Sequence, residues 1–200
     1  MLKNIILQRN EKGRNKAVER DIARVIINEK QIQEKLLELS KILIHDYQDK
    51  EWTVIAILNG SLIFLADLIR LIPFPIRLDT IDAATYGEST LPQGETKVIR
   101  QFKTDIEGKH VLVVDDIVDT GSTLKRVLED IKKYYPRTLK SCVLLNRSSR
   151  RRHHVRPEYC CFDIGDDYVV GYGLDYNNKY RNLPFIGVLK DECYHRNAII

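Results

Sequence analysis

Long hydrophobic runs are missing from this sequence of 200 residues. The longest apolar stretch, residues 61–72, is interrupted by Asp67 and Arg70 and falls well short of the roughly 20 residues that a membrane-spanning helix needs. Residues 1–10 hold too few apolar side chains for the core of a secretory signal. We therefore expect a cytoplasmic protein without a membrane partner.

Cysteine is scarce as well, with four residues and no C-x-x-C pair. A chain of this length does not depend on disulfide staples for its stability. We expect reduced thiols with a buried, structural role, in preference to a catalytic or metal-binding one, at Cys142, Cys160, Cys161 and Cys193.

No strong excess of one charge is present, because the formal net charge is +4. The basic residues nevertheless cluster in one segment, from Arg147 to Arg156, which we call the arginine segment. Such a cluster can bind nucleic acid, but no aromatic residue alternates with these arginines as a base-stacking platform requires. We expect a solvated loop on an enzyme that handles polyanions, and no nucleic-acid partner.

Strands alternate with helices along the chain, which has room for one complete core over residues 1–200. Asn28 and Gln31 form a capping box at the start of the first expected helix. The expected elements are a helix at 28–47, a strand at 53–58, a helix at 62–71, a strand at 111–115, a helix at 122–134 and a strand at 139–145. This order predicts an α/β domain with a mostly parallel sheet covered on both sides, and a long polar loop at Tyr86–Gly94.

The segment VLVVDDIVDTGSTL, from Val111 to Leu124, carries the most chemical information. In a parallel sheet, ligands bind beyond the carboxyl ends of the strands, where Asp115 and Asp116 are expected. The glycine, the hydroxyls and the free amides of a helix start at 119–123 suit a phosphate group. The acidic pair could accept hydrogen bonds from sugar hydroxyls or hold a divalent cation, and Asp119 could act as a general base. The other interpretation is an ordinary strand end with an aspartate capping the next helix.

The same segment resembles the phosphoribosyl pyrophosphate motif of the type I phosphoribosyltransferases, in which two acidic residues follow a hydrophobic strand and precede D-T/S-G-x-T. The two other common phosphate-binding motifs, G-x-x-x-x-G-K-[ST] and G-x-G-x-x-G, are absent. Resemblance to the hypoxanthine-guanine branch of the family extends over about residues 25–188. Three motifs carry it, namely LNGS at 58–61, TY at 85–86 with GETKV at 94–98, and YVVGYGLDY at 168–176 leading to Arg181.

This resemblance implies the type I phosphoribosyltransferase fold, a central, mostly parallel sheet flanked by helices, with a small hood formed from about residues 1–30 and 165–200. It implies purine salvage, in which hypoxanthine or guanine reacts with phosphoribosyl pyrophosphate to give IMP or GMP and pyrophosphate. Mg²⁺ is the implied cofactor, and a homodimer or homotetramer is the expected assembly.

Residue roles follow by position in the family motifs. Phosphoribosyl binding is implied for Asp115, Asp116, Asp119, Thr120, Gly121, Ser122 and Thr123, with Asp119 as the catalytic acid-base group. Pyrophosphate binding is implied for Asn59, Gly60, Thr85, Tyr86 and Arg181, with a non-proline cis peptide expected between Leu58 and Asn59. Base binding is implied for Arg147, Tyr168, Val169 and Asp175. Magnesium binding is implied for Asp175, Asp115 and Asp116.

Two positions depart from the family pattern. Arg147 replaces a lysine that contacts the purine 6-oxygen in most of this branch, and Asn59 stands where many relatives have Lys or Arg. A guanidinium donates to O6 and N7 of an oxopurine but meets an amino donor on adenine, so adenine should be a poor substrate. The ranking of hypoxanthine, guanine and xanthine stays open. A regulatory protein of the same fold that binds nucleic acid, or a transferase for adenine or a pyrimidine, are the alternative interpretations.

Overall fold

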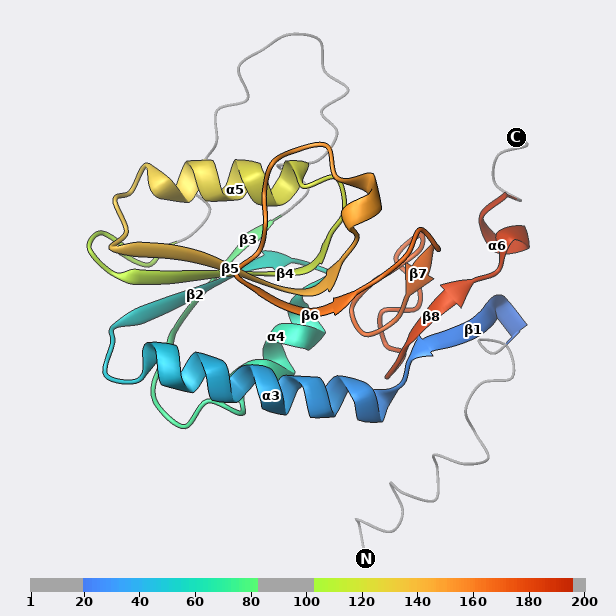
Figure 1. The fold of residues 1–200 in the computed structure, drawn as a ribbon, viewed down its shortest axis with the longest axis horizontal. Helices are drawn as coiled ribbons and strands as arrows, with labels where there is room; N and C mark the ends of the chain where they lie inside the picture. The colour runs from blue at the N-terminus through green and yellow to red at the C-terminus, as the bar shows by residue number, and fades with distance from the viewer. Residues whose placement is uncertain (1–19, 83–102, 196–200) are drawn as a thin grey trace, which may run out of the picture.

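The computed structural model describes residues 20–82 and 103–195. The expected loop from Tyr86 to Gly94 and the residues Thr85 and Tyr86 lie outside this part of the chain. The main sheet has five parallel strands in the order β3-β2-β4-β5-β6 (Figure 1). Their bounds are β2 Trp52–Leu58, β3 Arg77–Asp82, β4 His110–Val118, β5 Thr138–Asn146 and β6 Tyr159–Asp163. No helix among the described residues is long and apolar enough to cross a bilayer.

Helices cover both faces of this sheet (Figure 1). Helices α3 (Glu29–Tyr47) and α4 (Leu62–Ile69) lie on one face, and α5 (Ser122–Lys132) lies on the other. Along β4, Leu112 and Val114 belong to the core under α3 and α4, whereas Val111 and Val113 belong to the core under α5. Because both faces of the central strands β2 and β4 are buried, Trp52–Leu58 and residues 111–114 are almost continuously apolar instead of alternating. The predicted fold class is confirmed.

The capping box at the start of α3 is present as predicted. The side-chain oxygen of Asn28 accepts from Gln31 N at 2.9 Å, and the side-chain oxygen of Gln31 accepts from Asn28 N at the same distance. Helices α4 and α5 both end two residues before the predicted positions, an ordinary uncertainty at helix ends.

One predicted boundary is wrong. The strand expected to end at Asp115 continues to Val118, because its neighbour β5 goes on pairing with it through Ile117↔Leu145 and Val118↔Asn146. Asp115 and Asp116 therefore both lie within β4, although Asp116 was expected in the following turn, and that turn is confined to residues 119–121.

A second, antiparallel sheet has the order β1-β8-β7 and forms the hood. Its strands are β1 (Ile22–Ile27), β7 (Val169–Val170) and β8 (Ile186–Leu189), and the short helix α6 (Asp191–His195) follows it. Val25 pairs with Gly187 and Val169 pairs with Val188. Val169 and Ile186 also pack into the core under α3 and α4, so the hood is fixed against the main sheet.

Candidate active site

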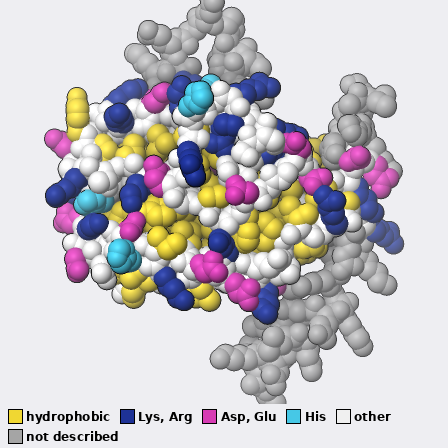
Figure 2. Space-filling model, viewed as in Figure 1, with side chains coloured by type: hydrophobic (Ala, Val, Ile, Leu, Met, Phe, Trp, Pro, Cys, Tyr) yellow, Lys and Arg dark blue, Asp and Glu magenta, His cyan; other side chains and the backbone are white. Residues whose placement is uncertain are grey.

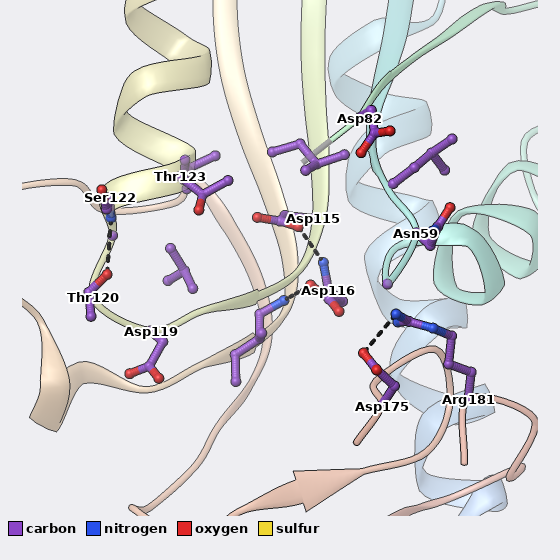
Figure 3. A pocket seen from close by; sticks show the side chains of 17 residues that line it. Asn59, Asp82, Asp115, Asp116, Asp119, Thr120, Ser122, Thr123, Asp175 and Arg181 are labelled. Atoms are coloured by element: carbon purple, nitrogen blue, oxygen red, sulfur yellow. Dashed lines mark hydrogen bonds and ion pairs between the residues drawn. The ribbon is translucent and has the colours of Figure 1, made fainter. Parts of the chain in front are cut away.

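A cavity of about 440 Å³ opens at the carboxyl ends of β2 and β4 (Figure 3). Eleven residues predicted for the phosphoribosyl, pyrophosphate and metal sites line it: Asn59, Gly60, Asp115, Asp116, Asp119, Thr120, Gly121, Ser122, Thr123, Asp175 and Arg181. They come from three separate stretches of the sequence. The fold therefore brings to one pocket the acidic motif at 111–124, the LNGS turn and the segment from Asp175 to Arg181.

The turn at residues 119–121 delivers the start of α5 to the pocket. Gly121 precedes the helix with φ +84°, a left-handed conformation that favours glycine. Ser122 N donates to Thr120 Oγ1 at 3.3 Å, which closes the turn (Figure 3). The N-terminal amides of α5 and the positive end of its dipole thus face the cavity wall, an arrangement that favours an anion such as phosphate.

The acidic pair lies on the cavity floor at the end of β4. Asp115 is buried, its Oδ1 accepts from Asp116 N at 3.0 Å, and Asp116 Oδ1 accepts from Ile117 N at 2.8 Å. Burial raises the pKa of both carboxyls, and the neighbouring charge of Asp116 raises that of Asp115 further. Two adjacent carboxylates away from water create a site that gains from a cation or from sugar hydroxyls as hydrogen-bond donors.

The turn after β2 forms the opposite wall. The peptide between Leu58 and Asn59 is cis, as the family resemblance led us to expect. A Cβ added to Gly60 would lie 1.7 Å from Asp116 Oδ2, and a Cβ added to Gly173 would lie 2.1 Å from Gly60 O. Glycine is therefore required at Gly173, which has φ +105° and meets backbone atoms, whereas a side chain at Gly60 would require the Asp116 carboxylate to move.

Arg181 reaches the cavity from the hood. Its Nη2 lies 2.7 Å from Asp175 Oδ1, and its Nη1 donates to Gly173 O at 2.7 Å (Figure 3). Asp175 Oδ2 in turn accepts from Asn178 N at 2.8 Å. The guanidinium is held in a fixed orientation at the mouth of the cavity, where its remaining N–H groups can face a phosphate.

Asp119 is the first residue of the turn 119–121, and its side chain is directed to Arg147, one of the residues expected to bind the base. Its Oδ2 lies 2.9 Å from Arg147 Nη1 and 3.9 Å from Arg150 Nη1. Its Oδ1 is buried and, within the described residues, has no hydrogen-bond partner. An acceptor oxygen without a donor is costly unless a ligand supplies one.

Of the expected base-binding residues, Asp175 lines the cavity and Arg147 contacts this carboxylate, whereas Tyr168 and Val169 are not among the residues that line the cavity. Tyr168 is 39% exposed and stands edge-on to Tyr176, with ring centroids 5.6 Å apart, whereas Val169 is buried in β7. Arg147 is buried, and its Nε and Nη2 donate to the carbonyls of Gly165 and Asp167 at 3.0 and 2.7 Å. Arg147 thus ties Asp119 to the loop that leads into Tyr168.

The arginine segment is a loop with most of its residues exposed, as expected, but two of its arginines are not solvated. Arg147 is buried and Arg151 is half-buried, because their guanidinium groups bind backbone carbonyls instead of water. On the face shown in Figure 2, basic side chains are interspersed with acidic ones and do not form a patch of one sign.

Asp82 is a cavity residue that the sequence analysis missed. It ends β3 and points toward the cavity beside Asn59 (Figure 3). Strand β3 has no clear apolar alternation, so it was not predicted. Its place at the carboxyl end of a parallel strand could have indicated a ligand-binding residue, but only if the strand itself had been recognised.

The fold and the cavity together define an α/β protein of the phosphoribosyl-binding class, and the family model described as phosphoribosyl transferase domain matches residues 26–177. The hypoxanthine-guanine phosphoribosyltransferase of Bacillus subtilis (strain 168) is 41% identical over 87% of this chain and 97% of its own length. The chain belongs to the phosphoribosyltransferase family, in its hypoxanthine-guanine branch.

Two further relatives support this assignment. The hypoxanthine-guanine-xanthine phosphoribosyltransferase of Tritrichomonas foetus is 38% identical over 87% of this chain and 95% of its own length. A crystal structure of a hypoxanthine phosphoribosyltransferase from Staphylococcus aureus superposes with a TM-score of 0.83 at 38% identity, covering 90% of this chain and 98% of that one.

Proposed function

We propose that this protein is a purine salvage enzyme that joins hypoxanthine or guanine to phosphoribosyl pyrophosphate and releases IMP or GMP with pyrophosphate. The observation that carries the proposal is the single cavity in which an acidic pair, a phosphate-binding helix start and Arg181 converge. In the reaction, the bond between the ribose anomeric carbon and the pyrophosphate oxygen breaks. A bond from that carbon to purine N9 forms, and the purine loses one proton.

The ribose 5-phosphate binds at the turn 119–123, where helix amides, hydroxyls and the glycine backbone serve as donors. Asp115 and Asp116 accept hydrogen bonds from the ribose hydroxyls. The pyrophosphate lies between the Asn59–Gly60 turn and Arg181, whose planar fork suits phosphate oxygens. Thr85 and Tyr86 complete this end by analogy with the family motif. These assignments rest on position in the motif and on the lining of the cavity.

The donor set of the cavity fits magnesium. Asp115, Asp116 and Asp175 offer carboxylate oxygens, which Mg²⁺ prefers, and the raised pKa values of the acidic pair indicate a site that gains from positive charge. No group of three or more acidic, histidine or cysteine ligands converges among the described residues. This suits a cation that is shared with the substrate phosphates. When bound, it neutralises charge on the departing pyrophosphate.

Asp119 is the group that takes the purine proton. Its buried, unpartnered Oδ1 supports this role, because the N7–H of the base is the donor that the oxygen lacks. Tyr168 stacks on the base, the backbone of Val169 binds its edge, and Asp175 closes that end of the pocket. Arg147 lies against Asp119 with one N–H left on each terminal nitrogen, from which it can donate to the 6-oxygen of the base.

The experiment is nucleotide formation by purified protein with Mg²⁺ and phosphoribosyl pyrophosphate, offered hypoxanthine, guanine, xanthine and adenine in parallel. We expect turnover of the oxopurines and little with adenine. Asp119→Asn should lower kcat by about 10² to 10⁴ fold while phosphoribosyl pyrophosphate still binds. No turnover of any base, or full turnover by Asp119→Asn at every pH, would contradict the proposal.

A further inference from the structure

The arginine segment binds the turn at residues 119–121 on the side away from the cavity. Three successive carbonyl oxygens, at the last residue of β4 (Val118) and at Asp119 and Thr120 of the turn, accept hydrogen bonds from residues 147–153. Backbone N–H groups donate to the outer two carbonyls: Arg147 N to Val118 O at 2.9 Å, and Arg152 N and His153 N to Thr120 O at 3.0 and 3.1 Å. The middle carbonyl, that of Asp119, accepts instead from a side chain.

That side chain is Arg151. Its Nε donates to Asp119 O at 3.0 Å, and its Nη2 donates to Val118 O at 3.3 Å and to Asn146 Oδ1 at 2.5 Å. Its Nη1 donates to Val155 O. One planar guanidinium therefore fixes two consecutive carbonyls of the turn against β5 and the arginine segment, a geometry that a single ammonium group cannot reproduce.

The aliphatic part of the Arg151 side chain also packs closely against the turn at Gly121. A Cβ added to Gly121 would lie 3.0 Å from Arg151 Cδ and 2.6 Å from Val155 Cγ1. In a trans peptide the C=O and the following N–H point in opposite directions. Because the carbonyls of residues 118–120 point toward the arginine segment, the N–H groups of residues 119–121 point the opposite way, toward the cavity.

We propose that Arg151 is a positioning residue for the 5-phosphate of the substrate: by binding the carbonyls of Val118 and Asp119, it orients the amides that receive that phosphate. The inference rests on the proposed function only for the identity of the ligand. Arg151 itself does not line the cavity and touches no reacting atom.

The test compares Arg151→Met and Arg151→Lys with Arg156→Met. Arg156 belongs to the same segment, is exposed, and forms no hydrogen bond or ion pair with the rest of the described chain. Binding of ribose 5-phosphate is measured by calorimetry, since this probe reports on the phosphate end without pyrophosphate, base or metal. Hydrogen exchange of residues 119–123 reports whether the turn has loosened.

We expect affinity for ribose 5-phosphate to fall about tenfold in Arg151→Met, less in Arg151→Lys and not in Arg156→Met. Exchange at 119–123 should quicken while β2 and β5 stay protected, and KM for phosphoribosyl pyrophosphate should rise with KM for hypoxanthine unchanged. Equal affinity in Arg151→Met and Arg156→Met, or full affinity in Arg151→Lys, would overturn the inference. If Arg151→Met does not fold, Arg151→Lys decides it.

The two proposals fail separately. If the unaltered protein binds ribose 5-phosphate but makes no nucleotide, the proposed function is wrong, and the comparison of Arg151 variants by binding still decides the positioning role. If both KM values rise together in Arg151→Lys, the side chain supports the fold in general and the positioning role is wrong.

Discussion

Arg147 Nη1 lies 2.9 Å from Asp119 Oδ2, so the residue expected to contact the base and the residue expected to take its proton form one ion pair. Lysine at position 147 would keep the charge but could not also reach the carbonyls of Gly165 and Asp167. We expect Arg147→Lys to raise KM for hypoxanthine about tenfold, the equivalent of about 1.4 kcal/mol, and to leave KM for phosphoribosyl pyrophosphate unchanged. Steady-state kinetics with Arg156→Lys as the matched control measures this. An unaltered KM for the base would contradict it.

Gly60 cannot be replaced without moving Asp116, because the new Cβ would lie 1.7 Å from its Oδ2. We expect Gly60→Ala to weaken binding of phosphoribosyl pyrophosphate in the presence of Mg²⁺ by about tenfold or more, through the displaced carboxylate. Gly165→Ala is the control, since a Cβ there meets nothing within 4 Å and the backbone carbonyl is kept. Calorimetric titration of the two variants measures the difference. Equal affinities would show that the turn adjusts without cost.

Asp46, at the end of α3, ties that helix to the main sheet. Its Oδ2 accepts from Tyr159 OH at 2.5 Å and from Lys140 Nζ at 3.0 Å. These hydrogen bonds lower the pKa of the Asp46 carboxyl far below its usual range. A lowered pKa contributes stability that is fully present above the unfolded value of about 4 and is lost as pH falls below it.

We therefore expect Asp46→Asn to lower the free energy of unfolding by about 1–2 kcal/mol at pH 7. The difference from the unaltered protein should shrink progressively below about pH 4, because the carboxyl of the unfolded chain then takes up a proton while the native carboxyl, with its lowered pKa, is still ionised. Urea unfolding at several pH values measures it, with exposed Asp49→Asn as the control. A deficit that stays constant down to pH 2 would mean that packing, and not charge, is lost.

The thiols should be unreactive in the folded protein. All four cysteines are free, and burial raises the pKa of Cys160 to about 11 and that of Cys161 to about 12. Since the thiolate is the reactive form, we expect iodoacetamide at pH 8 to label Cys142, Cys160 and Cys161 slowly until urea unfolds the chain. Mass spectrometry of the labelled peptides follows each site. Rapid labelling of Cys161 in the folded protein would be inconsistent with this packing.

The parts of the fold that could be predicted from the sequence are those fixed by local interactions. The capping box of Asn28 and Gln31, the buried strands β2, β4 and β5, and the glycine turn before α5 all depend on residues close together in the chain. The family motifs then indicated which residues line the cavity. The extent of β4 was wrong because it depends on its partner β5, which no local pattern records.

The missed features depend on contacts between distant segments. The hood strands are short, and their pairing joins residues far apart in the sequence, so no periodicity marks them. Arg147 and Arg151 of the arginine segment were not expected to be shielded from solvent, for the same reason. Nothing in its composition distinguishes a guanidinium in water from one that binds the carbonyls of Val118 and Asp119. Asp82 reaches the cavity only because β3 lies beside β2.

The antiparallel pairing of β1 with β8 has a consequence for biosynthesis. A ribosome makes β1 early, yet this strand finds its partner only after β8 has left the exit tunnel. The nascent chain can assemble the main sheet first, and β7, which carries Val169, acquires its neighbour β8 at the same late moment. The end of the site proposed to bind the base is therefore the last part to form, so a chain stalled before β8 would hold the turn at residues 119–121 without the wall proposed to receive a purine.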